Sequence, residues 1–256
     1  MKYPVIYTKD KLIVRILETP VELGQNAAKY VESKLDETIR KRSSARIIIA
    51  TGASQFELYK SLKKCNIDWK KITVFHLDEY AGMPASHPAS FRKYLKERIL
   101  DLVNPFQVHF LAGDAADLEA ESVRYAGLLM QGDIDLACIG IGENGHIAFN
   151  DPPVADFDDP KMVKLVKLDD DCKKQQMGEG WFPTIGDVPT HALSLTVPAI
   201  MRAKKISCVV PDQRKAKAVK NTVEGPVATS CPASILRTHP DAILWLDKDS
   251  ASLLEP

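Results

Sequence analysis

The sequence predicts an α/β fold with three layers: a mainly parallel, Rossmann-like sheet with helices on both of its faces. Short apolar runs of strand length alternate with helical patterns along the chain, as in repeated strand–helix units. The chain has 256 residues, of which 45% are hydrophobic, so one large core can form. We therefore expect a single domain over residues 1–256.

Six apolar runs have the length and the flanking turn residues of strands buried in a parallel sheet. They are "ARIIIATG" (45–52), "ITVFHLDEY" (72–80), "FQVHFLAG" (106–113), "IDLACIGIG" (134–142), "KISCVVP" (205–211) and "AILWLD" (242–247). Each is predicted as one strand.

Four stretches between these runs carry apolar residues at helical spacing. They are "QFELYKSLKKC" (55–65), "SFRKYLKERILDLV" (90–103), "AADLEAESVRYAGLLMQ" (115–131) and "QRKAKAVKNTVEG" (213–225). Ser54 precedes the first of them and is predicted to cap its N-terminus.

Ligands of open parallel sheets bind beyond the carboxyl ends of the strands, so the residues after each strand indicate the site. Four of the predicted strands lead into "TGASQ", "DEYAG", "GENGHIAFND" and "PDQRKAK". Hydroxyl, acidic, imidazole and basic groups from distant parts of the chain thus gather at one edge. We interpret this edge as a site.

The loop "GENGHIAFND" carries the strongest single signal. Glycines at 140, 142 and 145 permit unusual backbone angles and close approach of a ligand. A carboxylate at Asp151 can orient the imidazole of His146 and raise its basicity. The alternative is a structural histidine in a turn, and the position at a strand end favours function.

Three weaker signals each keep a structural alternative. Asp78 is a possible general base, or a salt-bridged rim carboxylate. The "ATGAS" turn holds either an anion on its backbone N–H groups or only a helix cap. The basic run 214–217 is either a phosphate contact or a solvated helix face.

Composition excludes several other classes. The 34 Lys and Arg balance 34 Asp and Glu, so no nucleic acid or anionic membrane is expected as a partner. The six histidines and five cysteines show neither metal-ligand spacing nor paired cysteines, so no metal and no disulfide are expected. No signal peptide or membrane span is evident in the sequence, and we expect a soluble, cytoplasmic protein.

Four stretches, taken together and in this order, resemble the glucosamine-6-phosphate deaminase (isomerising) family. They are "ATGASQFELYKSL", "FHLDEYAGMPASHPASF", "IDLACIGIGENGHIAFNDP" and "RKAKAVKNTVEGPVATSCPASILRTHPDAILWLD". The wider group also includes 6-phosphogluconolactonases. Those resemble the chain at the histidine loop but usually have Asp-Glu-Arg where this chain has Asp78-Glu79-Tyr80.

The resemblance implies a reaction and roles for residues. The family converts glucosamine 6-phosphate to fructose 6-phosphate and ammonia, without a metal or another cofactor. Asp78 would move a proton between C2 and C1, His146 would open the sugar ring, and Asp151 would orient His146. The residues that would hold the phosphate are Thr51, Gly52, Ala53, Ser54 and Lys215.

The chain departs from the family pattern in three places. Asn144 stands where an aspartate is frequent, and we expect its amide to hydrogen-bond the sugar. Asp151 replaces a glutamate, so its contact with His146 is expected to be water-mediated or rebuilt. The implied lid, around residues 155–187, lacks the usual arginine, for which Lys173, Lys174 or Gln176 are candidate substitutes.

These departures leave alternatives to a deaminase open. One is another reaction on the same fold, namely 6-phosphogluconolactone hydrolysis or isomerisation of a different aminosugar phosphate. The other is a sensor that binds a sugar phosphate without turnover. The expected partner is a small sugar phosphate in each case, and a homo-oligomer is possible.

Overall fold

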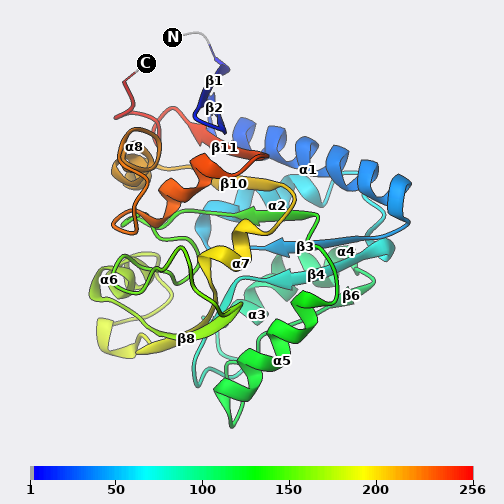
Figure 1. The fold of residues 1–256 in the computed structure, drawn as a ribbon, viewed down its shortest axis with the longest axis vertical. Helices are drawn as coiled ribbons and strands as arrows, with labels where there is room; N and C mark the ends of the chain where they lie inside the picture. Colours follow the sequence, from blue (N-terminus) through cyan, green and yellow to red (C-terminus); the bar gives the residue numbers. More distant parts are fainter. Residues whose placement is uncertain (1–2, 256) are drawn as a thin grey trace.

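The computed structural model describes residues 3–255 and contains an eight-stranded sheet (Figure 1). Its strands are β1 (Val5–Lys9), β2 (Leu12–Leu17), β3 (Ala45–Ile49), β4 (Ile72–His76), β6 (Gln107–Val108), β7 (Leu136–Ile139), β10 (Ile206–Val210) and β11 (Ala242–Asp247). They lie in the order β1-β2-β11-β10-β7-β3-β4-β6, and only the β1–β2 pair is antiparallel. The predicted, mainly parallel sheet is confirmed.

Helices cover both faces of this sheet. They are α1 (Pro20–Arg42), α2 (Phe56–Leu62), α3 (Phe91–Leu95), α4 (Asp101–Val103), α5 (Leu118–Met130), α7 (Val197–Met201) and α8 (Ala216–Glu224). Side chains alternate across a strand. Ile47 and Ile49 of β3 therefore pack in one core with α1, α2 and α3, while Ile48 packs in the other with α5, α7 and α8. The three predicted layers are confirmed.

A second, three-stranded sheet was not predicted. It pairs β5 (Asp78–Tyr80) with β9 (His191–Leu195), and β9 with β8 (Val163–Lys167), all antiparallel. The prediction of one strand over 72–80 is therefore wrong. The strand breaks at Leu77, whose carbonyl accepts a hydrogen bond from the Leu195 N–H at 2.8 Å, and the next residues leave the large sheet for β9.

Other local predictions differ from the structure in detail. The run 106–113 is a strand only over β6, and the hairpin β1–β2 and helix α1 fall in a region for which no element was predicted. The prediction that Ser54 caps the N-terminus of α2 is wrong as well. The chain enters α2 through a short 3₁₀ turn, Ala53–Gln55, and the Ser54 hydroxyl accepts from the Gln55 side chain at 3.0 Å.

The segment from β8 to β9 lies beside the carboxyl ends of the large sheet (Figure 1). It contains α6 (Asp170–Gly178) and a 3₁₀ turn at Ile185–Asp187. A small apolar cluster fastens it to β5, with Phe182 packing edge-on against Tyr80 at a ring-centre distance of 5.4 Å. Between residues 3 and 255, no helix has the length and apolarity needed to cross a membrane.

Candidate active site

A pocket of about 70 Å³ lies beyond the carboxyl ends of β3, β4, β7 and β10. The residues that line it include Thr51, Gly52 and Ser54 after β3, Asp78 after β4, Gly142 and His146 after β7, and Lys215 after β10. Helix α6 and the residue after it contribute Gln175, Gln176 and Glu179. The strand-end rule thus identified a set of residues that the fold brings together.

Asp78 faces this pocket from the first position of β5, and it is almost completely buried. Burial, and then the charge of the neighbouring Glu79, raise the pKa of the Asp78 carboxyl well above its ordinary value. A carboxylate with a raised pKa is a stronger base than one in water. Asp78 therefore has the chemical character of a general base.

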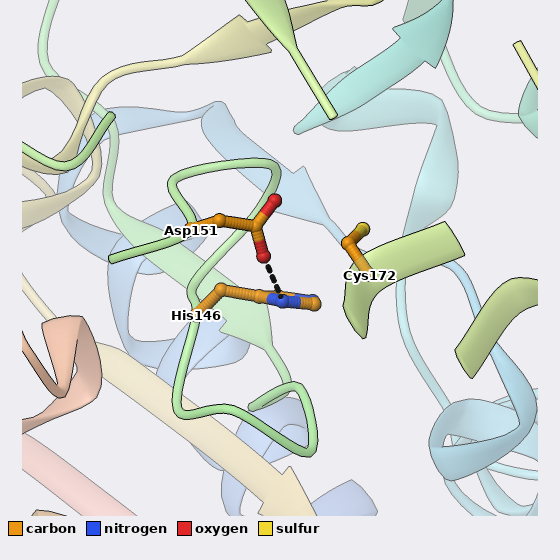
Figure 2. Close-up of side chains that lie close together, drawn as sticks. All are labelled: His146, Asp151 and Cys172. Carbon is orange, nitrogen blue, oxygen red and sulfur yellow. Dashed lines mark ion pairs between the residues drawn. The ribbon is translucent and has the colours of Figure 1, made fainter. Parts of the chain in front are cut away.

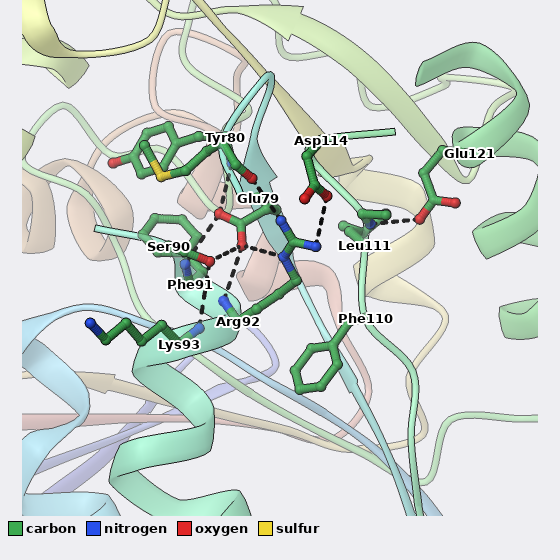
Figure 3. Close-up of polar contacts among 12 residues, drawn as sticks. Glu79, Tyr80, Ser90, Phe91, Arg92, Lys93, Phe110, Leu111, Asp114 and Glu121 are labelled. Carbon is green, nitrogen blue, oxygen red and sulfur yellow. Dashed lines mark hydrogen bonds and ion pairs between the residues drawn. The ribbon is translucent and has the colours of Figure 1, made fainter. Parts of the chain in front are cut away.

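The adjacent carboxylate, Glu79, does not line the pocket and is structural, with its donors shown in Figure 3. It accepts hydrogen bonds from the Ser90 hydroxyl at 2.8 Å and from the backbone N–H groups of Tyr80, Phe91 and Arg92 at 3.0–3.1 Å. The Arg92 guanidinium completes the set at 3.2 Å. Five donors on one buried carboxylate fix β5 against the start of α3.

His146 and Asp151 are in direct contact, so of the two expected arrangements, water-mediated or rebuilt, the structure has the rebuilt one. The Nδ1 atom of His146 lies 2.8 Å from Oδ1 of Asp151 (Figure 2). The carboxylate sits above the ring rather than in its plane, and no hydrogen bond to Nδ1 is found among the described residues. Burial alone would raise the pKa of Asp151, but the His146 ring and the Asn144 amide outweigh it and lower that pKa.

The histidine loop closes on itself through Asn144. Its side-chain amide donates to Asp151 Oδ1 at 2.8 Å, and its side-chain oxygen accepts from the His146 N–H at 3.0 Å. Asn144 lines a neighbouring surface cavity rather than the pocket that holds His146. Its position thus suits orientation of the His146–Asp151 pair, whereas the sequence suggested contact with the sugar.

The glycines of this loop serve two different purposes. Gly145 adopts a φ of +87°, which favours glycine. Gly142 has no such angle. A β-carbon there would lie 2.2 Å from the His146 ring, so Gly142 provides the space in which the imidazole sits. The expected unusual backbone therefore occurs at Gly145, and close packing accounts for Gly142.

The opposite end of the pocket has the features of an anion site. Gly52, at φ +102°, turns the chain into the 3₁₀ turn beside Thr51 and Ser54. The Lys215 ammonium group is buried, and no ion pair to it is found within residues 3–255. Burial accordingly lowers the pKa of Lys215. Ala53 does not line this pocket but a separate cavity, which Ser54 lines as well.

A carboxylate of the implied lid also reaches the anion site. Glu179 follows α6, and a β-carbon built on Gly52 would lie 3.9 Å from its Oε2 atom. The Glu179 side chain is held by donors from Gln175 at 2.9 Å and from the Trp181 indole at 3.3 Å. Among the charges that counter the effect of burial on the Lys215 pKa, Glu179 is the strongest.

Helix α6 is joined to the rest of the site by two further hydrogen bonds. The Glu143 N–H donates to Gln175 at 2.8 Å, and the Tyr80 hydroxyl donates to Gln176 at 2.7 Å. Lys173 and Lys174 pair instead with exposed aspartates of α6 itself, and neither lines the pocket. Neither lysine therefore takes the place of the family's arginine in this structure.

A family model described as glucosamine-6-phosphate isomerases/6-phosphogluconolactonase matches residues 18–245. The chain belongs to this family. Its curated relatives include a glucosamine-6-phosphate deaminase of Exiguobacterium sibiricum, 38% identical over 218 residues, which are 85% of this chain and 84% of the relative. Another, from Listeria innocua, is 42% identical over 207 residues, or 80% and 86% of the two chains.

Solved structures of this family have the same fold. A monomeric glucosamine-6-phosphate deaminase superposes with a TM-score of 0.86 at 32% identity, covering 94% of this chain and 99% of that one. A 6-phosphogluconolactonase from Thermotoga maritima gives 0.77 at 16% identity, covering 93% and 100%. At that identity, the second likeness concerns the fold alone.

Three residues near the pocket were predicted only as part of the lid segment, without roles of their own. Gln175 and Glu179 approach it from α6, and Cys172 of the same helix approaches the His146–Asp151 pair. Their local sequence is an ordinary polar helix. No pattern within it indicated which side chains face the histidine loop, since that depends on how β8 and β9 position α6.

We predict that Asp78→Asn raises the free energy of unfolding at neutral pH, by more than the roughly 0.5 kcal/mol typical of neutral surface changes. The folded-state pKa of Asp78 is raised, so its ionisation opposes folding. This penalty is absent below the pKa of the unfolded chain, about pH 4, and grows as the pH rises toward the folded-state pKa. Urea unfolding at acid and neutral pH measures it.

Glu79→Gln is the matched control for this prediction. The Glu79 carboxylate accepts five hydrogen bonds, so replacing it with an amide is expected to lower the free energy of unfolding at neutral pH. Lower stability of Asp78→Asn at neutral pH would contradict the assignment of Asp78 as a strained, functional carboxylate.

Proposed function

We propose that this protein is a glucosamine-6-phosphate deaminase, which converts glucosamine 6-phosphate and water to fructose 6-phosphate and ammonia. The observation that carries the proposal is the shared pocket: Asp78, His146 and Lys215 face it from three strand ends. Deaminases of the same family that are 38–42% identical to this chain support the choice of substrate.

The pocket has the groups that each step of this reaction needs. The buried Lys215 and the backbone at Thr51–Ser54 bind the phosphate, which holds the sugar in position. His146, with Asp151 stabilising its charged form, transfers a proton at the ring oxygen and opens the pyranose.

Asp78 then takes the proton from C2 of the open-chain sugar and returns it to C1. This transfer, together with a proton that passes from the nitrogen to O1, leaves an imine at C2, which water hydrolyses to the ketone with release of ammonia. One carboxylate suffices because the same proton is taken and returned. Its near-complete burial keeps that proton from exchanging rapidly with solvent.

We also propose that the segment 155–187 is a lid on a single domain. The pocket has a volume of about 70 Å³, whereas ligand pockets generally measure about 300–1,000 Å³. A sugar phosphate therefore enters only after part of the wall moves. Helix α6 is that part, because few hydrogen bonds join it to the histidine loop and β5.

The deaminase is tested by incubating the purified protein with glucosamine 6-phosphate and measuring ammonia and fructose 6-phosphate. We expect the two products in equal amounts, and no product from glucosamine, which lacks the phosphate. Galactosamine 6-phosphate and 6-phosphogluconolactone are the comparison substrates, and preferential turnover of either one would contradict the assignment. Binding without turnover of any of them would indicate a sensor.

The variant Glu179→Gln tests whether this carboxylate of the lid opposes binding of the phosphate. The carboxylate lies in the anion site that the phosphate must enter, so its removal is expected to lower KM for the sugar phosphate about fivefold, with kcat little changed. Glutamine keeps the size of the side chain. The effect should shrink at high salt.

Glu97→Gln, which removes an exposed charge in the helical turn Lys96–Leu100 between α3 and α4, is the control and should leave KM unchanged. A higher KM in Glu179→Gln would show that this carboxylate binds the substrate's ammonium group instead of giving way to its phosphate.

A further inference from the structure

Three side chains that can bind metals meet at the edge of the pocket (Figure 2). His146 and Asp151 come from the loop after β7, and Cys172 comes from the first turn of α6. One nitrogen, one oxygen and one sulfur atom of these residues lie within 4.8 Å of one another. All three side chains are buried.

Two atoms of this cluster have unused binding capacity. Asp151 is 0% exposed and His146 8% exposed. Oδ1 of Asp151 accepts from Asn144, whereas no nitrogen or oxygen donor reaches the buried Oδ2 among the residues that the structure describes, and the Cys172 thiol lies near enough to this carboxylate to help lower its pKa. Nδ1 of His146 likewise lacks a partner in its plane within this range. Buried polar atoms rarely remain unpaired, so the arrangement favours a further ligand.

We propose that His146, Asp151 and Cys172 form an inhibitory binding site for Zn²⁺. A mixed nitrogen, oxygen and sulfur set suits Zn²⁺, whereas Ca²⁺ and Mg²⁺ require oxygen ligands. Tetrahedral zinc bonds of about 2.0–2.3 Å place ligand atoms about 3.3–3.8 Å apart. Shifts of about 1 Å within the cluster achieve that geometry. The fourth position is open to water.

Binding at this site would block the enzyme in two ways. The ion occupies His146, which the proposed reaction needs for ring opening. It also ties α6 to the histidine loop, because Cys172 belongs to the proposed lid and the other two ligands do not. The Cys172 thiol gives its proton to the solvent as the sulfur binds the ion. Zinc would therefore hold the lid closed over an inactive site.

The binding site itself is tested with Co²⁺ as a spectroscopic substitute for Zn²⁺, which requires no turnover. We expect the full-length protein with Co²⁺ to show a thiolate-to-cobalt charge-transfer band that one equivalent of Zn²⁺ abolishes. Cys172→Ser should lack the band. Cys172→Ala serves the same purpose if serine is not tolerated in the apolar cluster around this residue.

Cys65→Ser is the matched control, because Cys65 is the most accessible of the five cysteines and lies outside the cluster. It should keep the cobalt band. No band in the unaltered protein, an equal band in Cys172→Ser, or loss of the band in Cys65→Ser would each overturn the proposal.

Inhibition is tested separately and rests on the proposed function. Zn²⁺ should inhibit glucosamine 6-phosphate turnover, and a chelator should restore it. Cys172→Ser should remain active without metal and need at least about tenfold more Zn²⁺ for half-inhibition. Equal sensitivity of the two proteins would overturn the inhibitory role. If no turnover is found at all, the cobalt band still decides whether the site exists.

Discussion

The buried carboxylate of Glu79 is the constraint on which the site depends. Its five donors join β5 to the first turn of α3, far from water, and this fixes the residue before it in sequence. Asp78 therefore points into the pocket beside a second negative charge and without solvent, which raises its pKa. One carboxylate is satisfied by hydrogen bonds, and the other keeps its reactivity.

The two ends of the pocket are built on different principles. At the histidine end, Gly142 leaves room for the His146 ring, and Asn144 hydrogen-bonds both His146 and Asp151. At the anion end, the fold buries a lysine without an ion-pair partner in the described chain, which is costly unless a ligand supplies one. The nearby Glu179 carboxylate lowers that cost in this structure.

Much of this site could be predicted from the sequence, because a parallel sheet brings the carboxyl ends of its strands together. Asp78, His146 and Lys215 followed from that rule and the motifs around them. The break at Leu77 did not, since the run 72–80 contains no glycine or proline that would mark a turn, and only pairing with β9 divides it. The contributions of Cys172 and Glu179 depend on the placement of α6, which tertiary contacts decide.

The central claim is that Asp78 carries the proton between C2 and C1. Its most direct test is to incubate glucosamine 6-phosphate in D₂O with the protein and with Asp78→Asn, and to follow the hydrogen at C2 by NMR. We predict that the unaltered protein transfers this hydrogen to C1, with at most partial exchange for deuterium, because Asp78 is buried. The variant should do neither while still binding the substrate in calorimetry. Exchange at C2 by the variant at an undiminished rate would contradict the account.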